Sequence, residues 1–188
     1  MKSTMQKQRG LSLIELMVSL VVGMIVIAGS IMMFGPISRS TSDALRSSKL
    51  NTDLQTAVDV MANELRRAGY VSNVGAVPPV VQVTDDGACV LYAYQEPGVG
   101  AVTWGGFAFE NNALTMIQGQ IAQPADCTVG QAWTDPALFT VTAVVFSCTD
   151  GGRAIEIELQ GQVGAGVNLP RKGVGSKTYL RNTTCVTV

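Results

Sequence analysis

An uncharged stretch near the N-terminus, from Leu16 to Ser38, constrains this chain more than any other feature. At about 1.5 Å per residue, a helix of this length crosses a hydrocarbon core about 30 Å thick. Three basic residues precede the stretch, and a balanced pair, Arg39 and Asp43, follows it. The positive-inside rule then leaves the N-terminus in the cytoplasm and places everything after Ser38 outside.

The segment before this stretch differs from an ordinary secretory signal, in which cleavage follows the apolar core. Here Gly10 precedes the core, and Glu15 lies at its start. A cut after Gly10 would leave the helix on the mature protein. The alternative is an unprocessed anchor in which Glu15 snorkels to the interface. A carboxylate at the membrane centre costs about 2.5–3.5 kcal/mol, which argues for a partner.

The run Gly10-Leu11-Ser12-Leu13-Ile14-Glu15 resembles the prepilin peptidase site of type IV pilins and pseudopilins. The resemblance implies cleavage between Gly10 and Leu11 and methylation of the new Leu11 amine. Most members have phenylalanine where this chain has Leu11. It also implies that Glu15 of one subunit neutralises the amine of a neighbour during filament assembly. Within one chain the same two groups could instead meet across a helical turn.

A second helical stretch is expected to follow a kink or break near Pro36, because proline removes a backbone donor. N-cap candidates lie in 40–43, and Gly69 is a natural stop. Arg66 and Arg67 suit the helix dipole better than a ligand site. Apolar residues recur at helical spacing and predict a face that packs on a sheet: Leu50, Leu54, Val58, Met61, Leu65 and Ala68.

The remainder is expected to be β-structure. Two hairpins are predicted at Glu110–Ala113 and Thr149–Gly152, because asparagine and glycine tolerate positive φ. We expect a glycine-rich loop over 161–175. The predicted strands are 89–94, 106–109, 114–117, 139–148, 155–162 and a final strand over 177–186.

Four cysteines follow the membrane stretch, and an even count in an exported domain predicts two disulfides. Four cysteines allow three pairings. We favour Cys89 with Cys127 and Cys148 with Cys185, because each pair closes a contiguous part of the head and the last strand needs tethering.

The composition argues against an enzyme and against a direct nucleic-acid binder. The chain has no histidine, which removes the commonest general base and metal ligand, and its formal net charge is −1. We expect no metal and no cofactor. Asp85-Asp86-Gly87 and Asp150-Gly151-Gly152 are read as turns rather than calcium loops. Trp104 and Trp133 are read as core residues rather than an adhesive surface.

Two further segments resemble PilW-type minor pilins: 59–70, which ends in Leu65-Arg66-Arg67-Ala68-Gly69-Tyr70, and Tyr179-Leu180-Arg181-Asn182. The resemblance implies a structural subunit that takes part in pilus assembly and lies at or near the pilus tip. J-type pseudopilins of type II secretion share the long-helix plan and are the nearest alternative. An alternative of another class is a membrane-tethered binding module that never polymerises.

Together these observations predict an α+β, pilin-like fold in which a long N-terminal helix packs on an antiparallel β-sheet head. The expected segments are a leader at 1–10, a transmembrane and polymerisation helix at 11–38, an amphipathic extension at 39–70 and a β-rich head at 71–188. The resemblance implies a bacterial inner-membrane precursor with a periplasmic head, which later reaches the pilus. The implied partners are the prepilin peptidase, other minor and major pilins, and a tip adhesin.

Overall fold

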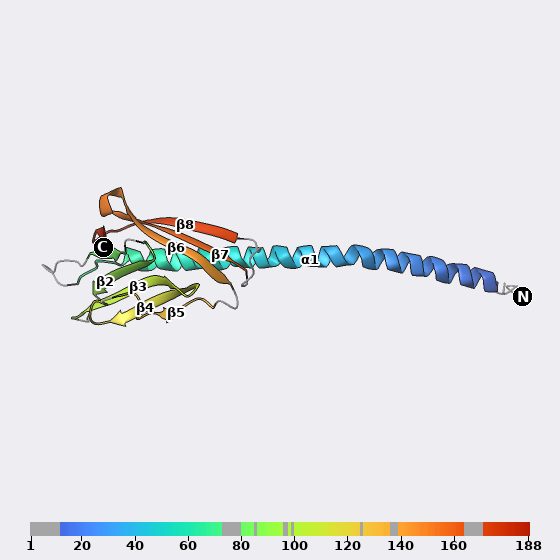
Figure 1. Cartoon of the computed structure of the whole chain (residues 1–188), viewed down its shortest axis with the longest axis horizontal. Coiled ribbons are helices and arrows are strands. Elements are labelled where there is room, and N and C mark those ends of the chain that lie inside the picture. Colours follow the sequence, from blue (N-terminus) through green and yellow to red (C-terminus); the bar gives the residue numbers. More distant parts are fainter. Residues whose placement is uncertain are drawn as a thin grey trace, which may run out of the picture. The chain divides into compact units, whose positions relative to one another are not determined.

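A computed structural model describes residues 12–72, 80–84, 86–95, 98, 100–124, 126–135, 139–163 and 171–188. The chain divides into two compact units, 1–45 and 46–188, which we call the anchor and the head. Figure 1 labels the helix α1 and the strands β2 to β8.

The helix α1 runs without interruption from Leu13 to Arg66 and belongs to both units. Of the kink or break expected near Pro36, the break is therefore wrong, since residues on both sides of the proline remain helical. Proline costs a helix one hydrogen bond, and transmembrane helices tolerate that loss. The N-cap expected in 40–43 is also wrong. The Thr41 hydroxyl donates to the Ile37 carbonyl oxygen at 2.9 Å, the i−4 bond of a mid-helix threonine.

In the head, the predicted apolar face of α1 is confirmed. Its six residues are each no more than 2 % exposed: Leu50, Leu54, Val58, Met61, Leu65 and Ala68. The chain then reverses at Gly69, whose φ is +72° and whose N–H donates to the Ala93 carbonyl oxygen at 2.8 Å. The predicted stop at Gly69 thus also attaches the end of the helix to a strand.

A six-stranded sheet has the order β5-β4-β3-β2-β1-β9. Its neighbouring strands are antiparallel, as expected, except for one parallel pair, β1 and β9. The sequence did not predict β1 and β5, which are too short to show an alternating pattern. The strands are β1 Val81–Val83, β2 Cys89–Gln95, β3 Val102–Glu110, β4 Ala113–Gln120, β5 Gln131–Ala132 and β9 Cys185–Thr187.

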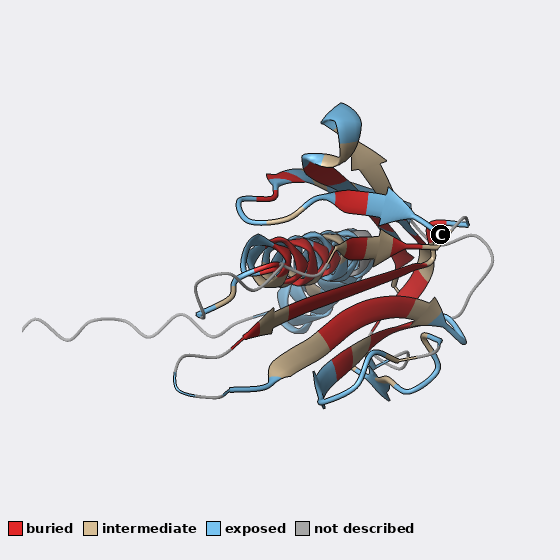
Figure 2. Ribbon diagram, turned by 90° about the vertical axis from the view of Figure 1, so that its left-hand side faces the viewer, coloured by how far each residue is buried: buried red, intermediate tan, exposed pale blue. Residues whose placement is uncertain are grey.

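A second sheet has the antiparallel order β6-β7-β8, with β6 at Thr140–Thr149, β7 at Ala154–Gln162 and β8 at Arg171–Tyr179. On β7, Ile155, Ile157 and Leu159 are buried while Glu156 and Glu158 are exposed, as the alternation predicts. In Figure 2 the red, buried parts of the strands lie around the helix, which is seen end-on.

The expectations for the C-terminal region need two corrections. The predicted loop over 161–175 is wrong at both ends, because β7 continues to Gln162 and β8 begins at Arg171; its middle, 164–170, lies outside the described residues. The single final strand is also wrong. The chain leaves β8 after Tyr179 and enters the other sheet as β9, since the two segments pair with different partners, β7 and β1.

Both predicted hairpins are present. Asn111 and Asn112 have φ of 51° and 59° between β3 and β4. Asp150, Gly151 and Gly152, all with positive φ, form a short 3₁₀ turn between β6 and β7. These are the conformations that asparagine, aspartate and glycine adopt most readily.

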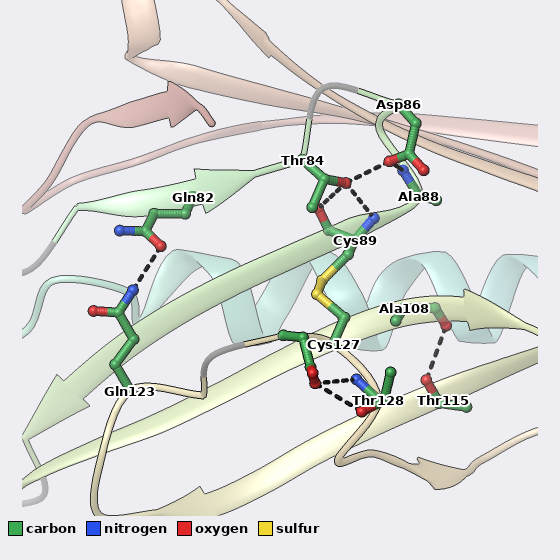
Figure 3. Close-up of a disulfide and its surroundings, with 11 residues drawn as sticks. Gln82, Thr84, Asp86, Ala88, Cys89, Ala108, Thr115, Gln123, Cys127 and Thr128 are labelled. Carbon is green, nitrogen blue, oxygen red and sulfur yellow. Dashed lines mark hydrogen bonds between the residues drawn. A yellow bond between two sulfur atoms is a disulfide. The ribbon is translucent and has the colours of Figure 1, made fainter.

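Disulfides join Cys89 to Cys127 and Cys148 to Cys185, the two pairs favoured from the sequence. Figure 3 shows the first, which attaches the segment after β4 to the outer side of β2. The second links β6 to β9 and therefore joins the two sheets covalently.

We predict that Gly69→Ala destabilises the head more than Gly98→Ala does. Both glycines have positive φ, which costs an alanine about 1–2 kcal/mol. At Gly98 a new Cβ would meet nothing within 4 Å, whereas at Gly69 it would lie 2.5 Å from the Thr183 Cβ and 2.9 Å from the Asn182 carbonyl oxygen. Denaturant unfolding of the full chain in detergent micelles measures the difference. Equal losses for the two variants would show that Gly69 is needed for its φ alone.

Candidate functional site

The N-terminal motif is described only from Ser12 onward, so Gly10 and Leu11 lie outside the described residues. Glu15 lies in the first turn of α1. The Ser19 hydroxyl donates to the backbone carbonyl oxygen of Glu15 at 2.7 Å. Among the described residues, none forms an ion pair or hydrogen bond with the Glu15 carboxylate, which leaves it available to a group outside them.

The anchor part of α1 exposes apolar side chains along its whole length. Leu16, Ile25 and Phe34 are 59 %, 66 % and 75 % exposed. The most apolar window of α1 has a mean hydropathy of 2.5 and none of it is buried, so the helix is long and apolar enough to cross a membrane. Such a surface is stable in lipid or against other apolar helices.

The end of α1 is held on β2 by a polar cluster that the sequence did not reveal. The Tyr92 hydroxyl donates to Glu64 Oε2 at 3.0 Å, and Arg67 Nη1 lies 3.2 Å from Glu64 Oε1. The Arg67 guanidinium also lies 3.9 Å from the centroid of the Tyr94 ring. Burial raises the pKa of Tyr92 well above its ordinary value, and the Glu64 charge raises it further, so the hydroxyl stays protonated and donates.

This cluster gives one of the two arginines an additional role. Both are exposed, and Arg66 donates to the Asn63 side-chain oxygen at 3.1 Å. Arg67 also pairs with Glu64 and packs on the Tyr94 ring. The spacing of Glu64 and Arg67, and of Tyr92 and Tyr94, was a usable signal, because each pair lies on one face of its element.

A groove of about 620 Å³ lies beside the Cys89–Cys127 disulfide (Figure 3). Asp86 on its rim accepts hydrogen bonds from the Thr84 hydroxyl and the Ala88 N–H, which hold the pKa of Asp86 below its usual value. Asp126 is held in the same way by the hydroxyl and N–H of Thr128, and its pKa is also lowered. Both carboxylates therefore close local turns.

The carboxylate of the other aspartate turn, Asp150–Gly152, forms an ion pair within the head. Lys177 Nζ lies 3.0 Å from Asp150 Oδ2, and this contact lowers the pKa of Asp150. Asp85 lies outside the described residues. In the described part of the chain, no group of three or more histidine, cysteine, aspartate or glutamate side chains could hold a metal ion.

The two tryptophans differ in their surroundings. Trp133 packs against the core, with its ring centroid 6.0 Å from that of Phe107. Trp104 is half-buried and lines a smaller cleft of about 310 Å³ near the Tyr92 cluster. The core interpretation is therefore correct for Trp133, whereas Trp104, on β3, faces the cleft.

The fold and the N-terminal segment are those of a type IV pilin-like protein. The prokaryotic N-terminal methylation motif matches residues 5–31, which include Gly10, Leu11 and Glu15. The solved structure of the type IV-like pilin TTHA1219 from Thermus thermophilus is similar with a TM-score of 0.53 and 14 % identity, over 72 % of this chain and 99 % of that one.

The chain belongs to the family described as prepilin peptidase-dependent protein B, which matches residues 43–173. No match was found among curated protein sequences. The pilin-like fold and the prepilin motif indicate a structural, non-enzymatic protein with a role in a pilus or pseudopilus.

We predict that Tyr92→Phe lowers the free energy of unfolding of the head by about 1.5–3 kcal/mol, the range for hydrogen bonds to charged groups. The ring remains, so packing is preserved while Glu64 loses one of its two partners. Tyr70→Phe is the matched control, because Tyr70 is 43 % exposed and its change should cost less than about 0.5 kcal/mol. Equal stability of the two variants in denaturant unfolding would contradict the role given to this hydroxyl.

Proposed function

We propose that this chain is a PilW-type minor pilin, inserted in the bacterial inner membrane with its head in the periplasm and then incorporated at or near the tip of a type IV pilus. One observation carries the proposal: the methylation motif, residues 5–31, includes the start of a helix whose most apolar window is wholly exposed. A helix of this kind can leave lipid only by exchanging it for the apolar helices of other subunits.

The proposed sequence of events begins with the prepilin peptidase, which cuts between Gly10 and Leu11. The new Leu11 amine is methylated. Glu15 then pairs with the amine of an adjacent subunit in the bundle of helices. Glu15 lies in the first turn of the exposed apolar helix, where the amine of an adjacent subunit can approach it. The head supplies surfaces for other minor pilins, the major pilin or a tip adhesin.

Processing is tested by the mass of the mature protein. We expect its N-terminus at Leu11, methylated, and we expect Gly10→Val to block the cut because a bulky side chain replaces glycine at the scissile bond. Gly29→Val is the control, since a Cβ at Gly29 meets nothing within 4 Å. Mature protein that still begins at Met1 in a piliated strain would instead favour a membrane-tethered binding module.

The role of Glu15 is tested by comparing membrane-bound and sheared-filament fractions at equal expression. Glu15→Ala should reduce incorporation more than about a hundredfold, because a broken buried ion pair costs about 3–5 kcal/mol. Export, cleavage and disulfide formation should be unchanged. Asp43→Ala is the matched control, because Asp43 lies on the same helix beyond the apolar stretch. Equal recovery of both variants in filaments would reject the pairing.

The same strains show whether the chain works in a type IV pilus or in a type II secretion system. Recovery with sheared pili supports the minor pilin, whereas a secretion defect with normal piliation would assign the chain to a type II secretion pseudopilus.

A further inference from the structure

The free edges of the two sheets differ in length. Among the described residues, the six-stranded sheet ends in β5 and β9, which have only two and three residues. In the other sheet, the outer side of β6 is covered: Phe146 N–H donates to the Gly87 carbonyl oxygen at 2.8 Å, and Val141 N–H to the Asn112 carbonyl oxygen at 3.2 Å. Short or covered edges are the usual protection against unwanted strand pairing.

The strand β8 is not short, and its basic side chains are the protection that its sequence provides. It has nine residues, pairs with β7 in unbroken register, and has no other strand partner in the described part of the chain. It contains no proline and no bulge. Its outer backbone groups therefore form the longest row that an additional strand could bond.

The direction of those groups follows from one hydrogen bond. Leu180 N–H donates to the Arg153 carbonyl oxygen at 2.9 Å, directly after the Tyr179–Ala154 pair. In an antiparallel ladder, bonded and non-bonded pairs alternate. The backbone N–H and C=O groups that point away from β7 are therefore those of Arg171, Gly173, Gly175, Lys177 and Tyr179.

Two of these five positions are glycines with no side chain to obstruct an approaching strand. Both are exposed. A Cβ added at Gly173 would lie closest to Gln160 Cγ, at 3.5 Å, and one at Gly175 would lie closest to the Ile157 carbonyl oxygen, at 3.4 Å. Those atoms belong to β7, and among the described residues no atom outside β7 and β8 lies within 4 Å of either added Cβ. Glycine weakens a strand interior and often marks a place where another backbone approaches closely.

The charge on this edge indicates what kind of strand it accepts. Arg171, Lys172 and Lys177 are basic, and β8 carries no carboxylate. Lys177 is paired with Asp150 and lies opposite Glu156. Arg171 and Lys172 lie opposite the uncharged Gln162 and Gly161, so their charge is not compensated across the strand pair.

We infer that β8 is the docking edge for an acidic extended segment of another subunit, which adds a fourth strand to the β6-β7-β8 sheet. Backbone hydrogen bonds supply the affinity, and alternate side chains supply the specificity. Acidic residues of the added strand lie on the exposed face beside Arg171, whose charge is not compensated across the β7–β8 pair. The identity of the partner as a pilus subunit rests on the proposed function.

A second copy of this chain fits the edge less well. An antiparallel β8–β8 pair centred on Gly175 places Arg171 of one copy opposite Tyr179 of the other and diagonal to its Lys177. Like charges in such cross-strand positions are unfavourable. Charge therefore favours a different, acidic strand over self-pairing.

The test uses the full chain in detergent micelles and two nine-residue peptides. In one, glutamate alternates with valine, and in the other lysine replaces glutamate. We expect the acidic peptide to slow amide hydrogen exchange at Gly173, Gly175 and Lys177 by at least about tenfold and to bind at least about tenfold more tightly than the basic one.

Two variants identify the backbone contact. Gly175→Pro removes an N–H that points away from β7 and should weaken acidic-peptide binding by about tenfold or more. Gly175→Ala keeps that N–H and should bind like the wild type. Arg171→Glu provides an independent check that leaves the backbone intact, and it should reverse the preference between the two peptides.

Equal binding of both peptides, or unchanged exchange along β8, would overturn the inference. So would a concentration-dependent dimer that protects the same amides without peptide, since the second copy would then be the occupant. Because the peptide assay needs no filament, its failure leaves the proposed function standing. If the Gly10 and Glu15 tests failed, the proposed pilin function would be rejected, but binding of an acidic strand to β8 would still stand.

Discussion

The structure depends on a single helix that must satisfy two different surroundings. In the anchor, α1 exposes apolar side chains around its circumference, as a helix in lipid does. In the head, the same element is amphipathic, with Leu50, Leu54 and Met61 buried and polar residues outside. Pro36 and the serine and threonine residues after it do not interrupt the element. The change from one environment to the other is therefore made by the pattern of side chains alone, with no break in the backbone.

The head fixes its end of the helix by three kinds of contact. The apolar face contributes most of the buried area, the Glu64–Tyr92–Arg67 cluster sets the position of the last turn, and Gly69 bonds to β2. Burial of the Tyr92 hydroxyl would be costly without the Glu64 carboxylate, because an unpaired buried donor loses its hydration. The polar contact thus favours one position of the helix along the sheet. Apolar contacts alone would discriminate less between neighbouring positions.

The features that the sequence revealed are those encoded by local patterns. The apolar face of α1, the stop at Gly69, the two hairpins and the alternation on β7 all follow from spacing or from residues that tolerate positive φ. The errors occur where distant segments decide the outcome. The strand β8 forms through its pairing with β7 despite two glycines, and β9 separates from it because β1 offers a partner. Strands as short as β1 and β5 are too short to show an alternation of apolar and polar residues. The Tyr92 cluster was missed because its helix part and its strand part are distant in sequence, with Glu64 and Tyr92 28 positions apart.

The parallel pairing of β1 with β9 also governs the order in which the head can form. The first strand after the helix has one of its two neighbours at the C-terminus, and Val188 N–H donates to the Val83 carbonyl oxygen at 2.9 Å. The Cys148–Cys185 disulfide likewise needs a residue from the last strand. Contacts between segments so far apart close slowly, since a long loop must be ordered first. The sheet edge at β1 therefore stays open until Cys185–Thr187 pair with it, and until then β1 presents an unprotected strand edge during folding.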